Sequence, residues 1–253
     1  MIVDPLFYLL AVPAVLLAGI SKGGFGGGLG VLAVPLMSLA VAPPQAAAVM
    51  LPILCIMDLM GVWAYRGKWD RANMAILIPA AVLGIAVGAL TYRYMDATLV
   101  RLLIGLLAVG FTLDYWLRRA DASARGPSLH LGGFWGAVSG FTSFVAHAGG
   151  PPLGIYLLPQ RLHRTQFVGT AAVFFIVVNY VKLVPYAWLG QLHLGNLSTS
   201  LVLAPLAPLG MGVGLWLHRR VSEVWFYRVC YTLLFGAGIK LLLDAAGESG
   251  WLG

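Results

Sequence analysis

Two segments decide the fold that this sequence predicts: SKGGFGGGLG at 21–30 and TSFVAHAGGPPLG at 142–154. Each of them interrupts an apolar stretch, the first within 5–42 and the second within 131–159. Glycine and proline at this density end helices and leave backbone groups without helical partners. Such irregular backbone is tolerated at membrane depth only where it is buried in protein or lines a cavity. In a membrane protein, the two breaks would therefore mark the functional site.

The composition predicts an integral membrane protein. Hydrophobic residues make up 60% of the 253 positions and charged residues only 10%, whereas a soluble domain carries roughly a quarter of its residues as charges. Six unbroken runs approach or exceed the roughly 20 residues that one crossing needs. They are 44–63, 74–92, 99–117, 167–188, 197–217 and 224–244. The chain has no room for an ATPase domain. Its lysines and arginines are scattered between apolar runs, so the net charge of +7 does not indicate a nucleic-acid partner.

We expect neither a cofactor nor a metal site. Cys55 and Cys230 lie inside apolar runs without metal-ligand spacing, and packing is a better interpretation for them than a disulfide. Residues 1–4 carry no basic region before the first apolar run, so we also expect no cleaved signal peptide.

The two broken regions belong to a repeat. We predict two homologous halves of a transmembrane domain, 1–118 and 131–253, joined by a cytoplasmic linker at 119–130. The alignment keeps a nearly constant offset and pairs Gly26 with Gly150, Pro35 with Pro159, Gln45 with Gln166, Asp58 with Asn179, Tyr65 with Tyr186, and Pro79, Gly84 and Gly88 with Pro205, Gly210 and Gly214.

Charge indicates that the repeat is inverted. The loop at 65–73 is basic and its counterpart at 187–196 is not, whereas the turn at 41–45 is uncharged and its counterpart at 160–164 is basic. Because positive loops face the cytoplasm, equivalent loops lie on opposite sides. Each half would then contain one re-entrant hairpin, with two arms of about 14 to 16 residues, too short to span, and three transmembrane helices. The basic loops at 65–73, 118–125, 161–164 and 218–220 would all be cytoplasmic, and Arg93 is the exception.

The breaks suit an anion. Lys22 lies near mid-membrane depth in this arrangement, where a cation is costly and by default functional; the alternative is that it snorkels to the interface. Backbone amides and half-helix N-termini at the breaks would add partial positive charge. His147 could donate to an oxyanion or carry a proton, or it could be a packing histidine. The candidate substrate-binding residues are Ser21, Lys22, Gly23, Gly24, Gly26, Gly27, Ser143, His147, Gly149, Gly150, Pro151, Asn179 and Lys182.

Asp58 and His147 are the candidates for proton coupling. Burial disfavours a charged carboxylate unless Lys22 or Lys182 pairs with it, and a buried ion pair is the alternative interpretation. We predict that Lys22→Ala abolishes anion binding while the protein stays folded and inserted and its stability holds or rises, because a burial cost of about 2.5 kcal/mol or more is removed.

Two other functions share some of these features. An anion channel would use the same groups as a carrier. An intramembrane Ser–His hydrolase would use Ser21, which lies in a G-x-S-x-G pattern at 19–23, together with His147; that pattern is meaningful only at a strand-to-helix turn, and no strand is predicted. The Gly-x-x-x-Gly spacings at 84/88, 132/136/140 and 210/214 indicate close helix packing rather than a site.

The sequence also resembles a known family. Residues 19–30, then Val34-Pro35-Leu36, Pro44-Gln45-Ala46, Asp58 and residues 65–70 are similar to the first signature of the sulfite exporter TauE/SafE family. Residues 140–152, with Asn179 and Lys182, are similar to its second signature. The resemblance implies a bacterial inner-membrane carrier for small sulfur-containing anions such as sulfite or organosulfonates, and no enzymatic activity.

Overall fold

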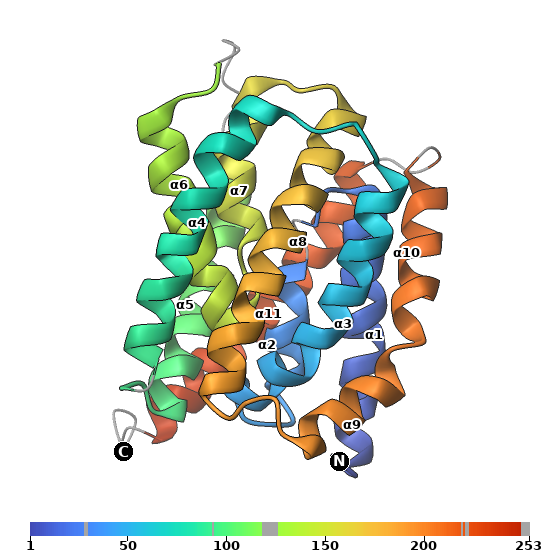
Figure 1. Ribbon diagram of the computed structural model, residues 1–253. Helices are drawn as coiled ribbons and strands as arrows, with labels where there is room; N and C mark the ends of the chain where they lie inside the picture. Colours follow the sequence, from blue (N-terminus) through green and yellow to red (C-terminus); the bar gives the residue numbers. More distant parts are fainter. Residues whose placement is uncertain (28–29, 93, 118–125, 219, 221–222, 249–253) are drawn as a thin grey trace.

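The computed structural model describes residues 1–253 except 28–29, 93, 118–125, 219, 221–222 and 249–253. Every regular element in the described part is helical, and the long helices run up and down a single bundle (Figure 1). The elements are α1 (Pro5–Gly24), η1 (Gly30–Leu32), α2 (Ala33–Met37), α3 (Pro43–Ala64), α4 (Arg71–Tyr92), α5 (Ala97–Leu117), α6 (Leu129–Ala146), α7 (Gly150–Leu157), η2 (Leu158–Gln160), α8 (Arg164–Trp188), α9 (Leu194–Leu203), α10 (Leu206–Leu217) and α11 (Glu223–Glu248).

Five of the six expected membrane-spanning runs coincide with helices that could cross a bilayer, and α1, which the sequence predicted as one arm of a hairpin, is also long and apolar enough to do so. Five helices in the described part, α1, α3, α4, α5 and α8, are long and apolar enough to cross a bilayer, and the pair α9 and α10, bent by 42°, adds a sixth. Local sequence sets several of the helix starts. Asp4 caps α1 by accepting a hydrogen bond from the Leu6 amide at 2.9 Å, and Pro5 occupies the first turn, where no amide donor is needed.

The two ends of the bundle differ in charge. Loops 65–70 and 158–163 lie at one end, where α10 also finishes at His218, and loops 38–42 and 189–193 lie at the other (Figure 1). We call the first of these the basic end because it carries Arg66, Lys68 and Arg161. The predicted basic loops at 65–73 and 161–164 thus share one end. The segment 118–125 and Arg93 lie outside the described residues, as does most of the expected linker; α6 already begins within its last two positions.

The broken regions form helical hairpins with unequal arms. In the first, α1 has 20 residues and the returning α2 only 5; in the second, α6 has 18 and α7 has 8. The expectation of two short arms of similar length is therefore wrong. The helix of α1 continues through Ser21–Gly24 because its glycines pack against α10: a Cβ on Gly23 would lie 2.5 Å from Met211 O, and one on Gly24 would lie 2.4 Å from Gly214 O.

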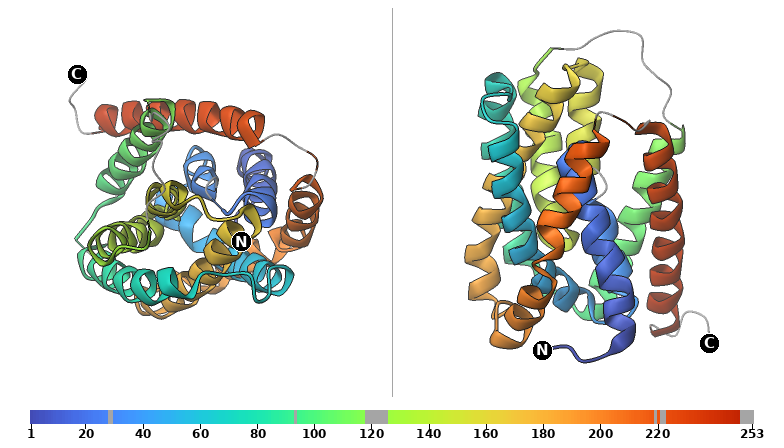
Figure 2. Two further views of the ribbon diagram at one scale, coloured as in Figure 1. Left: turned by 90° about the horizontal axis from the view of Figure 1, so that it is seen from above. Right: turned by 90° about the vertical axis from the view of Figure 1, so that its right-hand side faces the viewer.

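Close packing at glycines also joins α4 to α6. A Cβ on Gly84 would lie 2.0 Å from Ala137 O, and one on Gly140 would lie 2.1 Å from Ala81 O. The Gly-x-x-x-Gly segments therefore bring backbones together, as their spacing indicates. Seen from above, α5 and α11 lie along one side of the bundle and α2 lies inside it (Figure 2). Helices α3 and α8 pack against each other.

Candidate functional site

Three polar side chains meet between α1, α3 and α8. Asp58 of α3 forms an ion pair through Oδ1 with the Lys22 ammonium group at the end of α1. Asn179 of α8 donates from Nδ2 to Asp58 Oδ2 at 2.6 Å. The exposed fractions are 2% for Asp58, 9% for Lys22 and 1% for Asn179. The structure thus contains the buried ion pair that the sequence left as an alternative, and it rules out a snorkelling Lys22.

A second polar cluster joins α8 to the end of α6. Lys182, which is fully buried and lies one helical turn after Asn179, donates from Nζ to Ser143 O at 2.9 Å, to Ser143 Oγ at 3.0 Å and to His147 Nδ1 at 2.7 Å. Three acceptors match the three N–H donors of an ammonium group. His147 Nε2 lies 2.9 Å from Ala47 O, a pure acceptor, so this nitrogen carries the ring proton and Nδ1 accepts from Lys182.

His147 has an unusual backbone. Its φ of 52° places it in the left-handed region, which is uncommon for a residue other than glycine. The reason is the way α6 ends: His147 N donates to Ser143 O at 3.0 Å and Ala148 N donates to Thr142 O at 3.1 Å. The first of these bonds is the one that closes an αL cap, whose left-handed position is usually glycine. The cap turns the imidazole towards Lys182.

The first break differs from its expected geometry. Ser21, Lys22, Gly23 and Gly24 lie within the helix, so their amides take part in helical hydrogen bonds, and the amides of Phe25 and Gly27 both donate to Ser21 O. Because α1 ends here, it presents its partially negative C-terminus to the break, which favours the Lys22 cation. Gly26 and Gly27 follow with φ of 74° and 75°; Gly28 lies outside the described residues.

The second break keeps the expected helix start. Helix α7 begins at Gly150, with Pro151 and Pro152 in its first turn. Ser139 Oγ donates to Gly149 O at 2.7 Å, and a Cβ on Gly149 would lie 2.9 Å from Ser139 O. The amide of Leu153 donates to the same Gly149 carbonyl at 3.2 Å.

Around the ion pair there is very little free space. The cavity measures about 10 Å³, the room of a single water molecule. The Lys22 ammonium lies 4.9 Å from the centre of the Phe175 ring. The residues that line the cavity are Lys22, Gly26, Gly27, Met57, Asp58, Gly61, Ala171, Ala172 and Phe175. A polyatomic anion can reach Lys22 only when this site opens.

Neither break offers a hydrolase arrangement. Both ring nitrogens of His147 are engaged, one by Ala47 O and the other by Lys182, so His147 does not serve as a base for Ser21. Among the described residues, no group of three or more His, Cys, Asp or Glu could hold a metal ion. Cys55 is buried and free, and the side chain of Cys230 is outside the described residues.

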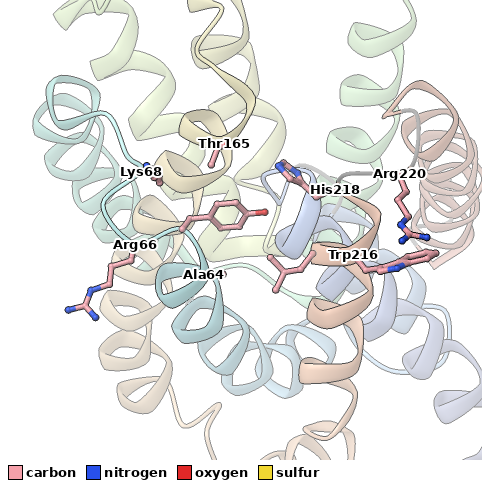
Figure 3. A pocket seen from close by; sticks show the side chains of 9 residues that line it. Ala64, Arg66, Lys68, Thr165, Trp216, His218 and Arg220 are labelled. Carbon is pink, nitrogen blue, oxygen red and sulfur yellow. The ribbon is translucent and has the colours of Figure 1, made fainter.

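The sequence did not identify two further residues beside Lys22. Tyr65 Oη donates to Gly23 O at 2.6 Å, and His218 Nδ1 lies 2.6 Å from Gly24 O. Both face a cavity at the basic end (Figure 3). The repeat alignment pairs Tyr65 with Tyr186, and Tyr65 also begins the segment 65–70 that resembles the family signature; these two signals could have identified it, whereas His218 stood only in a predicted basic loop.

Comparison with known proteins identifies the family. The family model described as Sulfite exporter TauE/SafE matches residues 11–241. No curated protein and no solved structure matches the chain. The match covers both breaks and both polar clusters, and it confirms the resemblance drawn from the two signatures.

Proposed function

Because the chain belongs to the sulfite exporter TauE/SafE family, and is therefore a multi-pass membrane protein of the sulfur-anion exporter type, we propose that it is a secondary transporter of a small sulfur oxoanion such as sulfite. We place it in the bacterial inner membrane, with the basic end in the cytoplasm. One observation carries the proposal. Two lysines and one carboxylate lie buried in two adjoining clusters, and such a site is one negative charge short of neutrality.

An inverted repeat is supported by hydrogen bonds that recur between the halves. Tyr65 Oη donates to Gly23 O at 2.6 Å, and Tyr186 Oη donates to Phe144 O at 2.7 Å, so donor and acceptor both shift by 121 positions. Helix α1 packs on α10 as α6 packs on α4. Such pairings are what a two-fold axis between the halves generates, and α1 and α6 run in opposite directions along the bundle (Figure 1), as an axis in the membrane plane requires.

A second recurrence lies near the helix ends. Gln45 Nε2 donates to Asn196 Oδ1 and Gln166 Nε2 to Asp70 Oδ2, each at 3.4 Å. Gln45 aligns with Gln166, and Asp70 and Asn196 occupy corresponding positions before α4 and within α9. The candidate site would lie between the two hairpins, near the midplane of such a repeat.

In this proposal Lys22 is the cation that binds the substrate. The Asp58 carboxylate competes with the anion for the Lys22 ammonium group. In the closed site the ammonium group is held by the carboxylate, and an anion cannot displace that carboxylate without leaving it buried and unpaired, which is costly. A proton on Asp58 removes this cost, because a neutral carboxyl group needs no cation. Anion binding and protonation of Asp58 therefore favour each other, which makes the proton a co-substrate that moves with the anion.

Lys182 and His147 supply the second contact in this proposal. When the ammonium group leaves its acceptors on Ser143 and His147, it can turn towards the anion, and the freed Ser143 hydroxyl can donate a hydrogen bond to an anion oxygen. Asn179 Oδ1 is buried without a hydrogen-bond partner among the described atoms. It can accept a hydrogen bond from a protonated oxoanion such as bisulfite or from a water molecule that accompanies the anion.

The test is transport of radiolabelled sulfite into proteoliposomes under an imposed pH gradient. We expect accumulation by the wild-type protein and none by Lys22→Met, which keeps the aliphatic stem and removes only the ammonium group. The matched control is Lys240→Met: Lys240 lies on α11 in an exposed pair with Asp244, 2.5 Å from Nζ to Oδ1, and its loss should leave transport unchanged. Sulfite flux without accumulation would indicate a channel, and equal transport by Lys22→Met would refute the site.

A further inference from the structure

We propose that the cavity at the basic end is a second anion site, which concentrates the oxoanion before it reaches Lys22, and that Tyr65 and His218 form the floor between the two sites. The inference rests on the proposed function, since it concerns the same substrate.

The cavity has the size and charge for a small oxoanion. Its volume is about 620 Å³, far more than the cavity of about 10 Å³ around the ion pair of Lys22 and Asp58. It is formed by the end of α3, the loop that follows, the start of α8 and the end of α10 (Figure 3). Its lining includes Arg66, Lys68, His218 and Arg220. No carboxylate in the described part of the chain pairs with these groups, so their charge is available to a ligand.

One wall of the cavity is aromatic. The Arg220 guanidinium lies 4.9 Å from the centre of the Trp216 ring, which holds its planar donors beside the cavity. Arg66, Lys68 and Arg220 are exposed, so solution anions reach them directly. By contrast, the cavity of about 490 Å³ at the opposite end is lined by Met1, Leu194, Gly195, Leu197, Ser198 and Leu201, none of which has a basic side chain. Of these two cavities, only the one at the basic end is lined by basic side chains.

The floor is built from the last turn of α1. The carbonyls of Gly23 and Gly24 lie in the last turn of α1, where backbone carbonyls run out of helical partners; Tyr65 Oη donates to the first and His218 Nδ1–H to the second, each at 2.6 Å. The two rings meet edge to face with their centres 5.9 Å apart. Lys22 directly precedes Gly23 in the chain. Tyr65 is 5% exposed and so closes the path from the cavity to the ion pair.

The floor must open at the side chains rather than between helices. Gly23 and Gly24 hold α1 against backbone atoms of α10 without room for a methyl group, so separating these helices would break the tightest contact there. Rotation of Tyr65 breaks its hydrogen bond to Gly23 O and leaves the contact between α1 and α10 in place. The structure therefore favours a gate formed by the Tyr65 side chain between the cavity at the basic end and Lys22.

The experiment measures sulfite transport from each side of proteoliposomes in which the protein has one orientation. In Lys68→Gln/Arg220→Gln we expect KM from the basic side to rise about tenfold at low ionic strength, and less than about twofold at high ionic strength, because positive charges raise local anion concentration and salt screens them. KM from the opposite side and the maximal rate should not change. The control, Arg71→Gln/Arg161→Gln, removes the same charge from exposed positions outside the cavity and should leave KM unchanged.

Four results would overturn the proposal. An equal rise in KM in the control pair would mean that the overall charge of this end matters and the cavity does not. If the cavity instead bound the phosphate of a lipid head group, the double variant would lose any dependence on phosphatidylglycerol in the vesicles and keep its wild-type KM. If the wild-type protein does not transport sulfite, the proposed function fails and this site falls with it; an unchanged KM beside normal wild-type transport refutes the cavity alone.

The gate has its own variant. Tyr65→Phe keeps the ring and removes the hydrogen bond to Gly23 O, so we expect sulfite exchange from the basic side to accelerate about fivefold, the factor that corresponds to one hydrogen bond of ~1 kcal/mol. An exchange rate equal to or below that of the wild-type protein would show that Tyr65 does not gate the path.

Discussion

Replacing Lys22 by methionine tests the central ion pair through its pH dependence. The substitution leaves the Asp58 carboxylate, 2% exposed, with only the hydrogen bond from Asn179. Removing one partner of a buried pair typically costs about 3–5 kcal/mol, whereas a neutral replacement of the whole pair roughly breaks even. We therefore expect Asp58 in this variant to take up a proton when the protein folds.

The free energy needed to protonate Asp58 sets the size of the expected loss in stability. An aspartate with the ordinary pKa of about 3.9 is ionised in the unfolded chain, and protonating it costs about 1.36 kcal/mol per pH unit above this value. Lys22→Met should thus be less stable than the wild-type protein by about 4 kcal/mol at pH 7 and by about 1.5 kcal/mol at pH 5. The sign follows because the folded variant binds one more proton than its unfolded chain, so its stability falls as pH rises.

Unfolding in mixed detergent micelles at pH 5, 6 and 7 measures these differences. The double variant Lys22→Met/Asp58→Asn is the control: it contains neither charge, and its stability relative to the wild-type protein should not vary with pH. The ion pair would be refuted if Lys22→Met were as stable as the wild-type protein, or if the difference in their stability did not change between pH 5 and 7. The sequence alone suggested that removing Lys22 would preserve or raise stability, because that expectation counted the burial of the ammonium group without its partner.

Four other substitutions test the coupling, the charge of the site, the helix packing and the topology. Asp58→Asn should keep sulfite exchange between equal pools and lose proton-driven accumulation, both measured in proteoliposomes; loss of both activities would make the ion pair purely structural. Asn179→Asp adds a second buried carboxylate and should abolish sulfite binding, measured as loss of the thermal shift that sulfite causes; an unchanged shift would refute the charge argument. Gly140→Ala, whose Cβ would lie 2.1 Å from a backbone oxygen of α4, should destabilise the protein by about 1–3 kcal/mol, whereas Gly133→Ala on the same helix meets nothing within 4 Å and should not. In a cysteine-free background, Leu194→Cys, at an 86% exposed position, should be labelled from outside intact cells, and a cysteine in the basic loops should not.

The fold could be predicted from the sequence wherever burial cost is large. A charged side chain inside a bilayer is costly and faces the interior of the bundle, where it can find a partner. The positions of Lys22 and Asp58 in apolar runs therefore indicate the candidate site. The loop charges predict which loops share one end of the bundle, because charged loops stay out of the bilayer and basic loops gather on its cytoplasmic side. Close packing of α4 on α6 follows from the glycine spacing at 132/136/140.

The lengths of the hairpin arms could not be predicted, because tertiary packing overrides local propensity. Gly23 and Gly24 look like a break in the sequence, since glycine is among the poorest helix formers. In the structure they are helical. Their packing against α10 stabilises this last turn, and α10 is so close that a residue with a side chain would not fit. Likewise, nothing local indicates that His147 would take the left-handed position of a helix cap, where glycine is the usual residue.

The difference between Asp58 and Asn179 gives the pseudo-symmetric site its charge. If aspartate stood at both positions, each lysine would have its own carboxylate and the closed site would be neutral, with no electrostatic reason to admit an anion. With asparagine at 179, Lys182 instead donates to Ser143 and His147, which bring no negative charge. The site then carries one uncompensated positive charge while Asp58 is ionised and two once Asp58 is protonated. Under the proposed function, and with both lysines protonated, a singly charged oxoanion would neutralise the first state and a doubly charged one the second. Protonation of Asp58 would then select for the more highly charged anion and couple its movement to that of the proton.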